Sequence, residues 1–216
     1  MCPSVNLAGA ATVLLPALFV LSQHPAPEVT ARWTPFVAKQ TVRRYEITST
    51  GKRCVHEETG VRMQDGNGST YTRTILVRGD PAEQTADAVL DDAPTGTTYR
   101  IDYSRREAHV MRRPPPGPYK PKSPENGDFL KQYAGDQIME KRTISGVECI
   151  RYGAPMAGSD ELVDNCVAPV LNYFPVFIRM PLGPGLEQEI LLEDIRVGEV
   201  PDPQFFRIPE GFKVVD

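Results

Sequence analysis

Residues 53–77, RCVHEETGVRMQDGNGSTYTRTILV, contain the pattern that decides the fold. Two runs rich in β-branched and aromatic residues, Arg53–Gln64 and Ser69–Val77, flank the sequence Asp65-Gly66-Asn67-Gly68. An Asn-Gly pair between two such runs is a strong signal for a β-hairpin, because both residues adopt a positive φ readily. This stretch therefore predicts two antiparallel strands joined by a tight turn.

Short strand patterns continue on both sides of this hairpin. Residues 41–47 are rich in β-branched and aromatic types, and residues 97–103 alternate strictly, with Tyr99, Ile101 and Tyr103 on one face. Further strands are expected at about 108–113, 139–145, 147–153, 160–167, 171–180 and 186–197. The connections are predicted as an acidic loop (79–96), an extended Pro-rich segment (113–124) and one short helix (127–137). The succession indicates a mainly β protein with a single, strongly curved antiparallel sheet.

Composition agrees with this class and excludes some functions. The 216 residues include 21 prolines and 17 glycines, which long helices tolerate poorly. With 40% hydrophobic and 24% charged residues, the chain is typical of a soluble globular protein. A net charge of -4 offers no basic surface for nucleic acid, whose binding depends on neutralising phosphates.

The N-terminus has the pattern of an export signal. Residues 7–21 are almost wholly apolar, a length typical of a signal-peptide core and short for a membrane span. We expect residues 1–26 to be a cleaved signal, with an uncleaved anchor as the alternative, and residues 27–216 to form one β-rich domain. The predicted location is the periplasm or the cell exterior, with at most a peripheral contact to a membrane.

The cysteines fit an oxidising compartment. Beyond Cys2, which lies in the apolar segment, the chain has Cys54, Cys149 and Cys166, so at most one internal disulfide forms. A hairpin of strands 147–153 and 160–167 with its turn at 155–159 places residue i opposite about 315 minus i. That register predicts a Cys149–Cys166 disulfide, with two buried free thiols as the alternative.

No recognisable catalytic or metal motif occurs. The histidines outside the leader, His56 and His109, stand in no metal-binding spacing, and the chain lacks Cys-x-x-Cys, a nucleophile elbow and a phosphate loop. His56 and Glu58 share a strand face, which we expect to be solvated, because alternating polar residues on antiparallel strands normally point outward. We therefore expect no catalytic residues, no metal and no cofactor.

The C-terminal residues carry a resemblance. Residues 195–206 (IRVGEVPDPQFF) and 208–215 (IPEGFKVV), with a weaker upstream match at 144–149 (ISGVEC), resemble the endings of a group of uncharacterised secreted bacterial proteins. That group looks distantly related to the outer-membrane lipoprotein carriers of the LolA/LolB type. The resemblance implies a half-barrel with a hydrophobic concave side, and it brings no catalytic residues.

Two apolar rows are the candidate ligand-binding residues. They are Tyr99, Ile101 and Tyr103 on one strand, and Phe174, Val176, Ile178 and Met180 on another. The first hypothesis is a protein that binds an apolar ligand, such as a lipid or a lipoprotein acyl chain, on the concave face. The alternative is an envelope interaction or sensor protein that binds another protein, through the acidic loop 80–92 or the Pro-rich segment. The alternative interpretation of these two rows is that their side chains pack on each other as ordinary hydrophobic core and bind no ligand.

Overall fold

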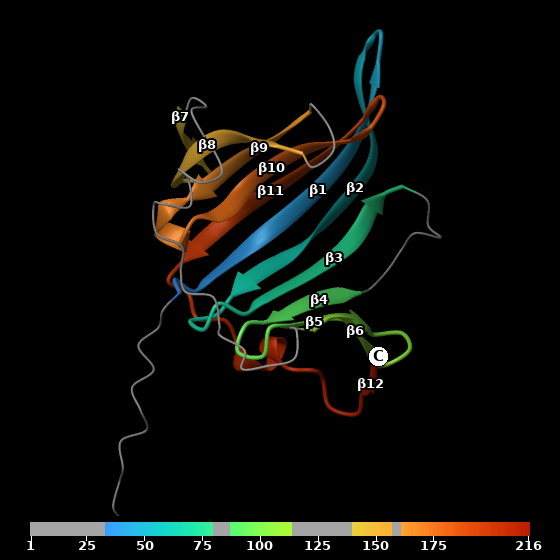
Figure 1. The fold of residues 1–216 in the computed structure, drawn as a ribbon, viewed down its shortest axis with the longest axis vertical. Coiled ribbons are helices and arrows are strands. Elements are labelled where there is room, and N and C mark those ends of the chain that lie inside the picture. The colour runs from blue at the N-terminus through green and yellow to red at the C-terminus, as the bar shows by residue number, and fades with distance from the viewer. Residues whose placement is uncertain (1–32, 80–86, 114–139, 157–160) are drawn as a thin grey trace, which may run out of the picture. The chain divides into compact units, whose positions relative to one another are not determined.

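The computed structural model describes residues 33–79, 87–113, 140–156 and 161–216, and Figure 1 shows their arrangement. The predicted export signal, the short helix 127–137 and most of the Pro-rich segment lie outside the described residues. Within them, no helix has the length and apolar character of a membrane span.

The described residues form one twelve-stranded sheet, which is open and strongly curved (Figure 1). The predicted fold class is confirmed. In chain order the strands are β1 (Phe36–Thr48), β2 (Gly51–Gln64), β3 (Thr70–Arg78), β4 (Ala88–Asp92), β5 (Thr97–Asp102), β6 (Glu107–Arg112), β7 (Glu140–Ile144), β8 (Val147–Pro155), β9 (Leu162–Ala168), β10 (Phe174–Gly183), β11 (Leu186–Val197) and β12 (Lys213–Val215). Two short 3-10 turns are η2 (Pro169–Leu171) and η3 (Pro203–Phe206). The strand order across the sheet is β12-β6-β5-β4-β3-β2-β1-β11-β10-β9-β8-β7.

The predicted β2–β3 hairpin is confirmed, and its turn shows how the sequence stabilises it. The Gly68 amide donates to the Asp65 carbonyl (3.2 Å), and the Asp65 carboxylate accepts from the amides of Asn67 (2.9 Å) and Ser69 (2.8 Å). Of the Asn-Gly pair, only Gly68 has a positive φ, 86°. The hairpin therefore depends on one left-handed glycine and one aspartate rather than on two left-handed residues.

Two strands were not expected from the sequence. β4 lies inside the predicted acidic loop, where Ala88 and Leu90 alternate as buried residues beside Asp91 and Asp92. The neighbouring acidic residues hide that short alternation. β12 pairs with β6 in parallel, so the sheet is not wholly antiparallel as predicted.

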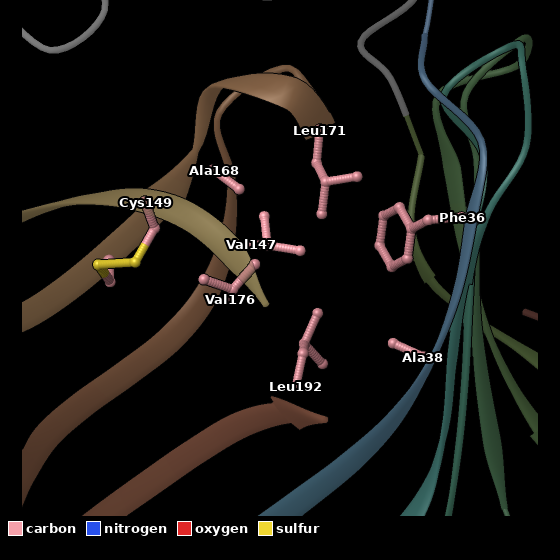
Figure 2. Packing of buried hydrophobic residues seen from close by; sticks show 9 residues of the cluster. Phe36, Ala38, Val147, Cys149, Ala168, Leu171, Val176 and Leu192 are labelled. Atoms are coloured by element: carbon pink, nitrogen blue, oxygen red, sulfur yellow. A yellow bond between two sulfur atoms is a disulfide. The ribbon is translucent and has the colours of Figure 1, made fainter. Parts of the chain in front are cut away.

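A first group of buried residues, called cluster I, packs β1 and β11 against β8–β10. Figure 2 shows Phe36 and Ala38 of β1 facing side chains from η2 and from strands β8 to β10. The Phe36 and Phe174 rings meet edge to face with centroids 5.0 Å apart. Cluster I comprises Phe36, Ala38, Val147, Cys149, Cys166, Ala168, Leu171, Val176 and Leu192.

A second group, called cluster II, includes Val37 and continues across β2 to β5. Its members are Val37, Met63, Tyr71, Ala88, Leu90 and Ile101. The C-terminal Phe205, Phe206 and Phe212 pack against it, with the Phe205 ring 5.3 Å from Tyr71 and the Phe212 ring 5.5 Å from Tyr103. Because consecutive strand residues point to opposite faces, clusters I and II occupy opposite faces of β1.

The predicted disulfide is present, in a different register. Cys149 and Cys166 are bonded, with their Cα atoms 5.5 Å apart. Cys166 lies opposite Arg151 and Ile150 lies opposite Val167, so the hairpin register is shifted by two residues from the predicted one. The prediction that the two cysteines face each other directly was wrong. The bond is diagonal, because a shift of two residues keeps both side chains on the same face.

At Gly60 the backbones of β2 and β3 leave no room for a side chain. A Cβ atom at this position would lie 1.8 Å from the Arg73 carbonyl oxygen and 2.8 Å from the Thr74 Cα atom. Both obstacles are backbone atoms, which cannot turn aside as a side chain does. Only glycine therefore fits between β2 and β3 at this point.

We predict that Gly60→Ala lowers the free energy of unfolding by about 3 kcal/mol, because the added methyl group forces β2 and β3 apart. Urea denaturation measures this loss. Thr59→Ala, on the adjacent β2 residue, serves as the control and should cost clearly less. An unchanged urea midpoint for Gly60→Ala would contradict this packing.

We predict that replacing Cys149 and Cys166 together by serine costs about 3 kcal/mol, because the unfolded chain loses a closed loop of 17 residues. The comparison variant is Cys54→Ser, which removes a thiol that forms no disulfide. Reduced and oxidised wild-type protein should differ by a similar amount in denaturant titration. Equal stability of the two forms would argue against the cross-link.

Candidate binding site

The two predicted apolar rows do not line one surface. Ile101 is fully buried in cluster II, and Tyr99 and Tyr103 pack against that cluster. The Tyr103 hydroxyl lies 3.0 Å from the Tyr71 hydroxyl, and Arg73 lies 4.4 Å from the centre of the Tyr103 ring. The first row is therefore engaged in packing within the sheet and with the C-terminal segment.

The second row is divided along β10. Val176 is buried in cluster I and Phe174 packs against it. The pairing of β10 with β9 shifts between Pro175 and Phe177, so the alternation does not run unbroken to Ile178 and Met180. Ile178 lies opposite Ile190 of β11 and is only half-buried. The structure thus brings Phe174 and Val176 together and leaves Ile178 and Met180 apart from them.

His56 and Glu58 form a contact that corrects the expectation of a solvated face. The His56 Nε2 atom lies 2.8 Å from Glu58 Oε1, and His56 is only 5% exposed. β2 lies between β1 and β3 in a wide sheet, where neighbouring side chains cover a residue of this face. His109 lies 3.1 Å from Glu107 and is more exposed. Within the part of the chain that the structure describes, no three His, Cys, Asp or Glu side chains are grouped to hold a metal ion.

A buried cation lies on β2. Arg62 donates to the hydroxyls of Thr70 (3.3 Å) and Thr72, and its guanidinium is 5.2 Å from the centre of the Phe174 ring. Burial lowers the pKa of Arg62 to about 10, against the attraction of Asp91. Thr70 in turn donates to Asp91 (3.2 Å), so this group links β2, β3 and β4. This group is a structural network within the sheet, and none of its residues lines the hollow described below.

A hollow with a volume of about 900 Å³ lies where β8–β11 meet the end of β1. Its side chains come from six elements of the sheet or their turns. The lining residues are Ile47, Glu140, Arg151, Tyr152, Gly153, Glu161, Leu162, Asp164, Arg179, Met180, Pro181, Gly183, Gly185, Leu186 and Glu187. Met180 is the only member of the two predicted apolar rows in this set.

An ion-pair group of three residues, the Arg151–Asp164–Arg179 group, forms one wall of the hollow. Arg151 donates to both carboxylate oxygens of Asp164, from Nε (2.7 Å) and from a terminal nitrogen (2.8 Å). Arg179 donates to the same carboxylate at 2.8 Å. The strand pairing explains this geometry, because Asp164 lies opposite Arg179 and two positions along from Cys166, the residue facing Arg151, so all three charged side chains share one face.

This group sets the charge state of the wall. Burial alone would raise the pKa of Asp164, but the hydrogen bonds and charges of Arg151 and Arg179 outweigh it and hold the pKa below the ordinary 3.8. The hydrogen bonds to Asp164 also raise the pKa of Arg151. The wall therefore presents two guanidinium groups around one carboxylate.

Apolar side chains border the same hollow. Ile47 is 45% exposed, Leu162 is 50% exposed and Leu186 is 44% exposed. Single exposed leucines are ordinary on a protein surface, whereas several large apolar residues around one hollow indicate a binding surface. Ile47 is held there by a hydrogen bond from its amide to the Gly185 carbonyl (2.7 Å), which joins the β1 end to the β10–β11 turn.

Sequence analysis missed this group although part of its signal was present. Arg151, Asp164 and Arg179 lie on three strands. Opposite charges on neighbouring strands are a signal of cross-strand pairing. The predicted hairpin register, with residue i opposite about 315 minus i, already places Arg151 opposite Asp164, so this pair could have been recognised from the sequence. Arg179 joins it through the pairing of β10 with β9, whose register the sequence does not fix.

Comparison with known proteins adds a likeness of fold. No family model matches the chain, and no curated protein matches it. Among solved structures, the MucA/MucB complex of Pseudomonas aeruginosa contains a similar chain, with 10% identity, a TM-score of 0.46, and coverage of 86% of this chain and 59% of that one. A LolA superfamily protein from Nitrosomonas europaea has 12% identity and a TM-score of 0.32, with 81% and 91% covered. A DUF1329 family protein from Desulfovibrio piger has 9% identity and a TM-score of 0.35, with 81% and 90% covered.

These neighbours bear on the fold alone. The chain spans less than two thirds of the length of the first of them. A LolA superfamily protein is among them, as the sequence resemblance led us to expect, while the C-terminal motif stays a prediction. At this level of similarity they indicate neither a ligand nor a partner for this protein.

We predict that Asp164→Asn destabilises the protein in a pH-dependent way. Because the folded-state pKa of Asp164 is below 3.8, its stabilising contribution is fully present above that pH and is lost as the pH falls through the folded-state value. The difference in unfolding free energy between wild type and Asp164→Asn should be larger at about pH 6 than at about pH 2.5. The exposed Asp194, replaced by Asn, is the control and should show no such trend.

Proposed function

We propose that this protein is a non-catalytic binding protein and that the hollow bordered by Ile47, Leu162 and Leu186 holds an apolar chain, such as that of a lipid. The observation that carries the proposal is the combination of this exposed apolar border with a volume of about 900 Å³. That volume is within the range of small-molecule sites, which are about 300–1,000 Å³. Three large apolar side chains exposed around one hollow support its use as a binding surface.

The position of the apolar side chains supports a single extended occupant. Leu162 lies two residues from Asp164 on β9, and Pro181 lies two residues from Arg179 on β10, so both share the face of the ion-pair group. Glu187 of β11 lies opposite Pro181 on one side and opposite Tyr45 of β1 on the other, so these three residues share a face. Ile47 lies two residues beyond Tyr45 along β1 and is therefore on that face as well. One ligand lying across β9, β10 and β1 would contact Leu162, Pro181 and Ile47.

We further propose that the protein works outside the cytoplasm. The Cys149–Cys166 disulfide supports this location, because such bonds persist mainly in oxidising compartments. The apolar segment at residues 7–21 fits the same proposal as part of an export signal that precedes a single domain at 27–216.

A second candidate function is the binding of another protein. It is favoured by Ile75 and Val77 of β3, which are each 60% exposed. β4 pairs with β3 only from Thr70 to Arg73, so these two residues lie beyond the strand pairing that the structure describes on that side. Exposed β-branched residues at the edge of a strand are a common feature of protein contacts.

We predict that a single-chain amphiphile such as dodecanol binds the purified protein and that the double variant Ile47→Gln/Leu162→Gln weakens binding by about tenfold or more, because apolar contact area is lost. Native mass spectrometry detects the complex, and fluorescence displacement gives the affinity. Val200→Gln removes a 73% exposed apolar side chain outside the hollow and should leave binding unchanged. An unaltered mass with every amphiphile tested would reject the proposal and favour a protein partner.

A further inference from the structure

We propose that the ligand of this hollow carries an anionic head group, a carboxylate or a phosphate, and that Arg179, with Arg151 beside it, binds that group. The inference rests on the proposed function, because it concerns the polar end of the molecule whose chain lies on Ile47 and Leu162. It assigns to the Arg151–Asp164–Arg179 group a role in recognition in addition to stability.

The Arg151–Asp164–Arg179 group carries a formal positive charge of its own. Two guanidinium groups share the single carboxylate of Asp164, which gives a formal charge of +2 - 1 = +1. Three further acidic residues line the hollow: Glu140, Glu161 and Glu187. Glu187 pairs with Lys52, and Glu140 pairs with Arg142 at 3.0 Å, with Arg151 further away at 3.6 Å. The guanidinium groups that line the hollow therefore both belong to the Arg151–Asp164–Arg179 group.

Arg179 has the donors that a second anion requires. Among the described residues its side chain donates one hydrogen bond, from a terminal nitrogen to Asp164. A guanidinium has five N–H donors, so most of those of Arg179 are available to a ligand. Its side chain is 40% exposed and lines the hollow. Arg151, in contrast, uses two nitrogens on Asp164 and is 32% exposed.

Asp164 prepares this arrangement for an anion. A guanidinium held by a carboxylate on one side keeps its planar fork fixed, and a fixed fork binds carboxylate and phosphate groups with two parallel hydrogen bonds. The anionic head would lie at Arg179, with its chain running over Pro181 toward Ile47. Charge and apolar surface are thus placed for the two ends of one molecule.

The test compares three ligands with the same chain: dodecanoate, dodecyl phosphate and the uncharged dodecanol. Both anions should bind wild type about tenfold more tightly than dodecanol, since hydrogen bonds to charged groups are the stronger ones. Arg179→Gln should reduce the affinity of both anions to about that of dodecanol, so that the preference for an anion is lost. Arg196→Gln, which removes a 62% exposed arginine outside the hollow, should change none of the three affinities.

A second variant gives an effect of opposite sign, which misfolding cannot imitate. Asp164→Asn removes the internal competitor for both arginines and should tighten the binding of dodecanoate relative to that of dodecanol. If the phosphate alone binds more tightly than dodecanol, the head group is a phosphate, and if dodecanoate binds as tightly, a carboxylate is sufficient.

The outcomes separate this inference from the proposed function. Equal affinity of the anions and dodecanol in wild type, or an unchanged preference in Arg179→Gln, would overturn the anionic head group and leave the apolar site in place. If none of the three ligands binds, the proposed function itself fails and the inference fails with it.

Discussion

The fold depends on the burial of β1 on both faces. Phe36, Val37 and Ala38 are consecutive and all buried, with exposed fractions of 0%, 7% and 2%. Because side chains alternate along a strand, the first and third enter cluster I and the second enters cluster II. A one-residue slip of β1 would exchange the two sets of contacts, so the burial of both faces fixes the register of β1 against β2 and β11.

From that central strand, each half of the sheet has its own means of covering its apolar face. On the β2–β6 side, the C-terminal phenylalanines pack against cluster II. On the β8–β10 side, strands curve back toward β1 and the disulfide fastens two of them (Figure 2). The curvature that forms cluster I also leaves the hollow where β8–β11 meet the β1 end, so core and candidate site have a common origin.

The candidate site contains charges that the fold must already satisfy. Asp164 is 16% exposed at its side chain, and the two arginines outweigh the effect of burial and hold its pKa below the ordinary value. The same contacts hold Arg151 and Arg179 in place at the edge of an apolar border. Stability and the proposed recognition of an anion therefore use one group of residues.

The sequence alone determined the fold class, most strand positions and the disulfide partners, because alternation, turn residues and cysteine count act over short distances. It did not reveal β4, whose alternation is masked by acidic neighbours, or the parallel pairing of β12. The tertiary structure alone decided that Tyr99 and Ile101 pack within cluster II and that Arg179 joins Arg151 and Asp164, which the predicted hairpin register had already placed opposite each other. The physical reason is that the register between neighbouring strands and the packing of the sheet's faces depend on contacts that no single strand pattern encodes.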